Sequence, residues 1–191
     1  MPDDAEIEVY FDSLAEMFSE YGITKDSGNV VDVRHILLVP EGGTTDDTGA
    51  TTYSEEEWEA CRLNAEDLLK TWKDGDATEA SFAELANTYS ADPGSNTNGG
   101  LYPEITPESA YVEPFLNWCM DPANVVGATG IVKTEFGYHI MFMSAAEPQW
   151  MYYAKSQYIS DRTTELVETG VEKHPIEIEN DKICLMELAL V

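Results

Sequence analysis

The residues most able to do chemistry in this 191-residue chain are its three histidines, His35, His139 and His174. His35 lies in the apolar run at 33–37 and His139 in the run at 136–140, so we expect both on buried strands. A buried imidazole without a hydrogen-bond partner costs about 1–3 kcal/mol. We therefore expect the two rings to hydrogen-bond to each other across adjacent strands, one donating and one accepting. On the residues alone this pair is more readily structural than functional, and His174 is expected in a surface loop.

No motif for a nucleophile or a metal accompanies the histidines. The chain has no G-x-S-x-G, H-E-x-x-H or Walker sequence, and Cys61, Cys119 and Cys184 form no C-x-x-C pair. We expect these cysteines to be buried free thiols. Residues 46–49 resemble the start of a calcium loop but lack its alternating ligands and distant Glu. The sequence therefore predicts neither a metal nor a cofactor.

The charge of the chain excludes several classes of partner. It carries 37 acidic and 10 basic residues, a formal charge of −27. Nucleic acids and anionic membrane surfaces both require cations, so neither is an expected partner. The sequence contains no apolar run near the length of about 18 residues that a membrane span needs. Its N-terminus lacks the pattern of a signal peptide, although removal of a signal or anchor would leave the same appearance.

Hydrophobic periodicity and capping signals divide the chain into helices and strands. Helices are expected at 3–22, from the capping box at 54–57 to Gly75, from a second box at 81–84, at 112–120 and at 150–169. Strands are expected at 31–40, at 128–133 and 137–143, and at 175–190, although 183–191 is equally compatible with helix. A short apolar piece lies at Leu101. Turn formers at 41–53 and 90–100 predict loops. The layout is a compact unit at about 31–146 with a helix before it and a helix and tail after it.

Four blocks of sequence, in order, resemble the parvulin-type peptidyl-prolyl isomerases. Residues 33–38 (VRHILL) resemble the opening strand of the family, and residues 82–93 resemble its second helix and the following loop. The Gly-Gly-Leu at 99–101 resembles the family's Gly-Gly-x-Leu turn but is one residue tighter. Residues 132–140 (VKTEFGYHI) match the closing hairpin almost verbatim and are the most specific of the four.

The resemblance implies an α+β fold, in which helices wrap a four-stranded antiparallel sheet and a cleft binds a prolyl residue. It divides the chain into an N-terminal flanking helix and linker at 1–29, an isomerase domain at 30–146, and a C-terminal helix and tail at 147–191 that could be a chaperone segment. The family's catalytic positions fall on His35, Asp92, Thr134 and His139. Its substrate-binding positions fall on Leu101, Tyr111, Phe115 and Phe136.

Two of these positions have particular features. Tyr111 replaces the more usual Met of the proline pocket. Asp92 stands where family members have Cys or Asp, and it also begins an Asp-Pro-Gly turn, which is an alternative reason for its presence. Isomerisation breaks no bond, so neither a strong nucleophile nor a metal is required, and we expect Asp92 to act through its charge rather than covalently. The histidines are expected to hold the geometry of the site.

The implied activity is cis–trans isomerisation of X–Pro bonds in unfolded or secreted chains. Phosphate-directed parvulins carry a basic cluster after the first strand, whereas residues 35–61 contain no Lys or Arg and seven Asp or Glu. We therefore expect clients with neutral or basic residues before proline, not phosphorylated ones. The alternative is a non-catalytic parvulin-like chaperone or peptide-binding module. Parvulin domains often occur in bacterial extracytoplasmic foldases, which suggests an extracytoplasmic location for this protein. Exchange of the flanking helices between two chains would give a homodimer, and the sequence leaves this possibility open.

Overall fold

The computed structural model describes residues 2–173. Its centre is a four-stranded antiparallel sheet in the order β4-β1-β6-β5, which confirms the expected sheet. The strands are β1 (Asn29–Leu38), β4 (Leu101–Ile105), β5 (Thr129–Thr134) and β6 (Gly137–Pro148). The predicted strand at 175–190, together with His174 and Cys184, lies outside the described residues.

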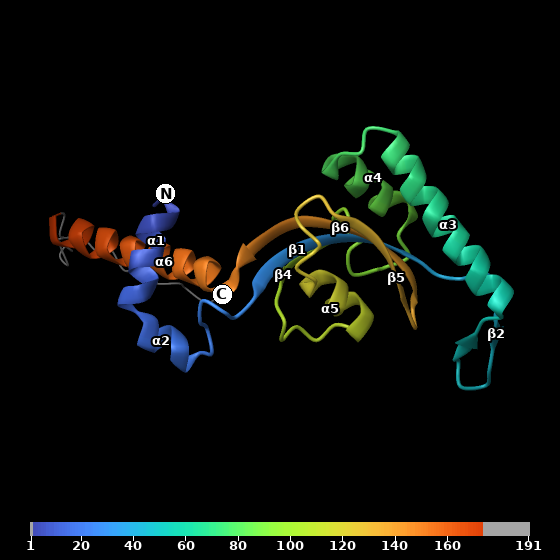
Figure 1. Cartoon of the computed structure of the whole chain (residues 1–191), viewed down its shortest axis with the longest axis horizontal. Helices are drawn as coiled ribbons and strands as arrows, with labels where there is room; N and C mark the ends of the chain where they lie inside the picture. The colour runs from blue at the N-terminus through green and yellow to red at the C-terminus, as the bar shows by residue number, and fades with distance from the viewer. Residues whose placement is uncertain (1, 174–191) are drawn as a thin grey trace, which may run out of the picture.

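Helices cover both faces of the sheet (Figure 1). On one face lie α3 (Glu55–Asp74) and α4 (Glu79–Tyr89), and on the other lies α5 (Glu113–Met120). The central strand β6 is therefore buried without interruption from residue 137 to residue 143, because its side chains meet helices on both sides. β6 continues five residues beyond its predicted end and leads directly into the next helix.

Each face of the sheet has its own hydrophobic core. Residues Ile36, Tyr138, Ile140 and Phe142 face α3 and α4 and pack on Phe82 and Trp72, with Cys61 in the same cluster. The other face places Val33, Met141 and Met143 against α5, around Phe115 and Cys119. Cys61 and Cys119 are both buried and free, as predicted. Because side chains alternate along a strand, the two faces never share a residue.

The prediction of a single helix at 3–22 was wrong. This segment forms two helices, α1 (Asp4–Ser13) and α2 (Ala15–Glu20). In one continuous helix, residues seven apart are about 10 Å apart along the axis. The break at Leu14 instead brings the rings of Phe11 and Phe18 to a stacked contact of 4.9 Å. Phe11 also contacts Trp150, so packing on the C-terminal helix offsets the lost helical hydrogen bonds.

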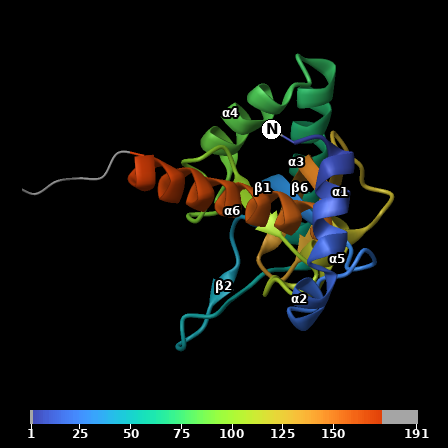
Figure 2. The same ribbon diagram turned by 90° about the vertical axis from the view of Figure 1, so that its left-hand side faces the viewer.

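The C-terminal helix α6 (Gln149–Lys173) crosses α1 at one end of the sheet, as Figures 1 and 2 show. It is four residues longer at its C-terminal end than the predicted 150–169. Ala154 of α6 is fully buried in the cluster that it forms with Ile7 and Phe18. Within residues 2–173, no helix has both the length and the apolar character needed to cross a membrane.

Two local predictions also need correction. The helix α4 begins at Glu79, three residues before the expected start, because Thr78 rather than Ser81 is its N-cap. Ser81 occupies the third helical position instead, where its hydroxyl accepts a hydrogen bond from the Trp72 indole at 3.0 Å. The exposed segment 41–53 contains a short hairpin of β2 (Thr44–Thr45) and β3 (Thr51–Thr52), and Asp46 closes its turn by accepting from the amides of Thr48 and Ala50.

Gly100 lies where the loop before β4 meets β1, and its backbone has φ +71°. Its carbonyl accepts a hydrogen bond from the His35 amide at 2.8 Å. A Cβ at this position would lie 2.2 Å from the His35 carbonyl oxygen, so the strand and the loop leave no space for a side chain. Gly127 has a similar φ of +87°, but a Cβ there would meet nothing within 4 Å.

We predict that Gly100→Ala lowers the free energy of unfolding by about 3 kcal/mol or more, because it adds a backbone clash to the unfavourable φ. Gly127→Ala adds only the unfavourable positive φ and should lower the free energy of unfolding by about 1 kcal/mol. Chemical denaturation of the two variants measures both values. Equal losses would contradict the close approach of the loop to β1.

Candidate functional site

The loop at 90–100 carries Asp92 across the end of β1. The amide of Ala91 donates to the carbonyl of Leu37 at 2.8 Å, and the amide of Gly100 donates to the carbonyl of Ser95 at 2.9 Å. The loop is therefore tied to itself and to the strand, and Ser95 at its centre is fully buried. Loops normally lie on the surface, so a buried serine indicates that this one is built to hold side chains in fixed places.

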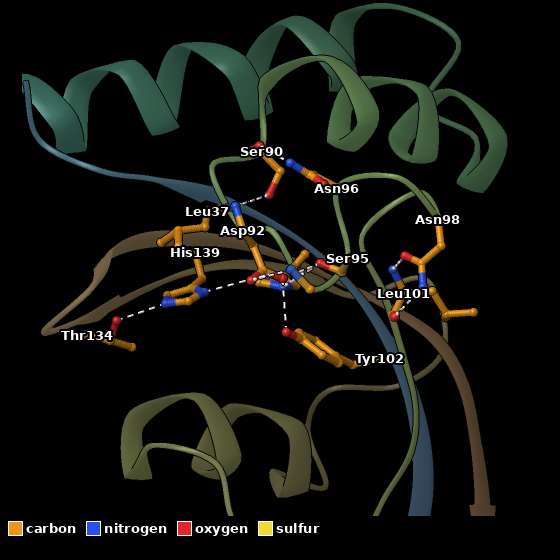
Figure 3. A network of polar contacts seen from close by, with 12 residues as sticks. Leu37, Ser90, Asp92, Ser95, Asn96, Asn98, Leu101, Tyr102, Thr134 and His139 are labelled. Atoms are coloured by element: carbon orange, nitrogen blue, oxygen red, sulfur yellow. Dashed lines mark hydrogen bonds and ion pairs between the residues drawn. The ribbon is translucent and has the colours of Figure 1, made fainter.

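A continuous chain of polar contacts runs from β5 to this loop, between the sheet and α5 (Figure 3). Thr134 Oγ1 lies 2.8 Å from His139 Nε2. His139 Nδ1 lies 3.0 Å from His35 Nδ1, which confirms the predicted contact between the two rings. His35 Nε2 lies 3.1 Å from Asp92 Oδ2. The residues facing these two histidines in the sheet register are Met141 and Leu37, so the pair is diagonal.

Asp92 receives several further hydrogen bonds. The hydroxyl groups of Ser95 and Tyr102 both donate to its Oδ2, the latter at 3.0 Å, and the Gly94 amide donates to Oδ1 at 3.2 Å. Partial burial pushes the pKa of Asp92 upward, but these hydrogen bonds outweigh it and hold the pKa below the ordinary value. Asp92 is therefore an ionised acceptor at neutral pH.

The charge of Asp92 determines the proton positions along the chain. Since a carboxylate only accepts, His35 must carry its proton on Nε2, and its Nδ1 must then accept when the ring is neutral. His139 must donate from Nδ1 and accept at Nε2. The hydrogen bond to Nε2 comes from the Thr134 hydroxyl, which itself accepts from the Phe136 amide at 3.1 Å. Every hydrogen bond in the chain thus points toward Asp92.

Burial keeps both rings neutral. It lowers the pKa of His139 to about 4, with the neighbouring His35 as the second cause. Burial also lowers the pKa of His35, although the Asp92 charge opposes this effect. Two neutral, oriented imidazoles are suited to hold a geometry rather than to exchange protons with a substrate.

An aromatic cluster of Tyr102, Tyr111 and Phe115 lies directly against the histidine pair. The Phe115 ring meets His35 and His139 edge to face, at centroid distances of 5.4 and 5.5 Å. Tyr102 stacks on His35 at 5.0 Å, and Tyr111 lies 5.3 Å from Phe115. The cluster forms an apolar wall next to a carboxylate, and Phe115 is 2% exposed because the two tyrosines cover it.

Six of the eight predicted site residues meet here: His35, Asp92, Tyr111, Phe115, Thr134 and His139. Leu101 does not join them, because it pairs with Arg34 and its side chain therefore lies on the opposite face of the sheet from His35. Figure 3 shows Leu101 directed away from the chain of contacts. Phe136 is 55% exposed in the turn between β5 and β6, at the rim of the site.

Ser95 and Tyr102 belong to the site and were missed. Tyr102 pairs with Val33, on the face that also carries His35. Because side chains alternate along a strand, Leu101 and Tyr102 lie on opposite faces, and this alternation could have identified Tyr102 as the residue that faces the site. Ser95 had no comparable signal, since its place depends on how the loop folds back to Gly100.

Metal and nucleophile chemistry find no support in the part of the chain that the structure describes. Within it, no three His, Cys, Asp or Glu residues are grouped to hold a metal ion. Cys119 lies on the buried face of α5, where burial raises the pKa of its thiol to about 12. That thiol is protonated at neutral pH and does not serve as a nucleophile.

Comparison with known proteins gives one family. The family model described as "PPIC-type PPIASE domain" matches residues 11–146. The Campylobacter jejuni protein named "Putative peptidyl-prolyl cis-trans isomerase Cbf2" is 31% identical over 115 residues, which are 59% of this chain and 40% of that protein. "Foldase protein PrsA 1" of Listeria innocua is 29% identical over 112 residues, which are 53% of this chain and 38% of that protein.

The chain thus spans about two fifths of the length of these curated relatives. Among solved structures, PrsA from Bacillus subtilis aligns with a TM-score of 0.45 at 22% identity, over 93% of this chain and 57% of that one.

We predict that Tyr102→Phe raises the pKa of Asp92 and lowers the free energy of unfolding by about 1 kcal/mol, because it removes one hydrogen bond to the carboxylate. Tyr111→Phe is the matched control, since Tyr111 lies in the same aromatic cluster and Tyr102 supplies the phenolic hydrogen bond to Asp92. Titration of the Asp92 carboxyl carbon by NMR measures the pKa in each variant. Identical Asp92 pKa values in the two variants would refute this role for Tyr102.

Proposed function

Since the chain belongs to the PPIC-type peptidyl-prolyl isomerase family, we propose that it catalyses cis–trans isomerisation of X–Pro bonds in unfolded or extended polypeptides. The observation that carries this proposal is the aromatic wall of Tyr102, Tyr111 and Phe115 beside the Asp92 carboxylate. An apolar surface binds the prolyl ring, and a fixed charge acts on the carbonyl beside it. The relatives named as an isomerase and as foldases support polypeptide clients.

The site suits a reaction in which no bond breaks. Rotation about the X–Pro bond faces a barrier of about 18–20 kcal/mol, and each tenfold acceleration needs about 1.4 kcal/mol of preferential stabilisation of the twisted state. A planar amide has a partly negative carbonyl oxygen, which the Asp92 carboxylate repels. Twisting reduces that charge, so the carboxylate and the dry aromatic wall both favour the twisted state over the planar one.

In this mechanism each part of the site has its own role. Tyr111 is a half-buried side chain in the segment before α5. In the proposed complex its side chain rotates away, and the prolyl ring then packs on Phe115. Asp92 remains ionised and noncovalent. Thr134, His139 and His35 act as positioning residues, because their directed hydrogen bonds hold Asp92 in place. Phe136 at the rim is proposed to contact the residues beside the proline.

Charge around the site favours neutral or basic residues before proline. The two cations nearest in sequence to the site residues are engaged on the other face of the sheet. Arg34 pairs with Glu79 at 2.8 Å, and Lys133 lies over the Trp58 ring at 4.4 Å. A phosphoserine before proline would therefore meet the Asp92 carboxylate, and neither of these two cations is in place to receive it. An extracytoplasmic location remains a prediction from the family resemblance.

The proposal predicts isomerisation of tetrapeptides with alanine or lysine before proline, measured by NMR exchange spectroscopy. Wild-type protein should accelerate both, and it should accelerate the phosphoserine peptide at least tenfold less because of charge repulsion. Phe115→Leu should lower kcat/KM about tenfold or more, since it removes the face on which the prolyl ring packs.

Phe82→Leu is the matched control. Phe82 is an equally buried phenylalanine in the core on the other face of the sheet, so the substitution has a similar effect on stability without touching the site. It should leave kcat/KM within about twofold of wild type. Absence of acceleration by the wild-type protein would contradict the proposed function, and equal losses in the two variants would contradict the placement of the prolyl ring.

A further inference from the structure

A groove of about 650 Å³ lies between α3 and the end of β1, on the face of the sheet that α3 and α4 cover. The chain of polar contacts lies on the other face, next to α5 (Figure 3). The groove and the proposed proline site therefore lie on opposite faces of the sheet. Nothing in the isomerisation mechanism uses it.

The floor of the groove is apolar and partly exposed. It is formed by Leu38 and Val39 at the end of β1, Cys61 and Leu68 on α3, and Tyr89 at the end of α4. Val39 is 38% exposed and Tyr89 is 54% exposed. Adjacent exposed apolar side chains in a concave surface indicate a place where another chain packs.

Every ionisable side chain along the rim is acidic. Glu41 and Glu56 line one end and Asp67 lines the other, and no Lys or Arg is among the lining residues. Glu41 and Cys61 line the same groove, so this carboxylate lies beside the apolar floor. Glu57 also lines the groove, but it is occupied by hydrogen bonds from the amides of Gly43 and Ser54.

Two of the three cations of α3, Arg62 and Lys70, are paired with acids of the same helix, and the third, Lys73, does not line the groove. Arg62 binds Glu59 and Glu66, and Lys70 binds Asp74. Among residues 2–173, no ion pair engages the rim carboxylates at 41, 56 and 67, which leaves them available to a cation from outside. A second copy of this chain is a poor occupant, because each copy carries a formal charge of −27.

We propose that this groove binds an extended, basic segment of a polypeptide client, with Lys or Arg at the acidic rim and apolar side chains on the floor. The proposal rests on the proposed function only for the choice of an unfolded polypeptide as client. A client held here keeps its basic segment on one face of the sheet while a prolyl residue reaches the other. The groove would select basic, apolar clients independently of proline.

The test uses the proline-free peptide acetyl-Lys-Leu-Lys-Leu-Lys-Leu-Lys-amide, with binding measured by calorimetry and mapped by amide NMR shifts. We expect shifts at Asn64, Leu68 and Tyr89 and weaker binding at high salt. The variant with Glu41→Gln, Glu56→Gln and Asp67→Asn should bind about tenfold more weakly, because three ion pairs are lost.

The matched control neutralises three exposed acids far from the groove, with Glu16→Gln, Glu20→Gln and Asp26→Asn. It changes the net charge equally and should bind the peptide within about twofold of wild type. Equal weakening in both triple variants, shifts confined to Tyr102 and Phe115, or no binding at millimolar peptide would each overturn the proposal. Because the peptide lacks proline, these outcomes are independent of whether the protein isomerises X–Pro bonds.

Discussion

The carboxylate of Asp92 accepts hydrogen bonds and donates none, and the geometry of the site follows from this constraint. His35 must donate to it, so His139 must donate to His35 and Thr134 must donate to His139. Burial lowers the pKa of both histidines and keeps them neutral, which allows each ring to have one donor and one acceptor. A cationic His35 would also carry a proton on Nδ1, opposite the Nδ1 proton of His139, and the contact between the two Nδ1 atoms would become repulsive.

The sheet supplies the other constraint, because alternation assigns each residue to one face. One face presents His35, His139 and Tyr102 to α5 and holds the proposed chemistry. The other face packs on α3 and α4, and at its edge the acidic groove opens to solvent. A single layer of strands thus separates two surfaces with different proposed ligands, a prolyl ring and a basic segment.

Much of this arrangement could be predicted from sequence where the pattern is local. A histidine in each of two apolar runs predicts their contact, and the hairpin at 132–140 places Thr134 beside His139. Leu101 was misplaced because the Gly-Gly-Leu turn is one residue tighter than in the family, and a shift of one residue moves a side chain to the other face. Ser95 and the break at Leu14 depend on contacts between distant segments, namely the return of the loop to Gly100 and the packing of Phe11 on Trp150. Periodicity does not contain such information.

The directed chain of hydrogen bonds is tested most directly by the tautomers of the two buried histidines, which long-range ¹H–¹⁵N correlation spectra reveal. At pH 7 we expect two neutral rings, with the proton of His35 on Nε2 and that of His139 on Nδ1. His139 should remain neutral until the pH approaches about 4. A proton on Nε2 of His139, or a cationic His35 or His139 at pH 7, would rule out hydrogen bonds that all point toward Asp92.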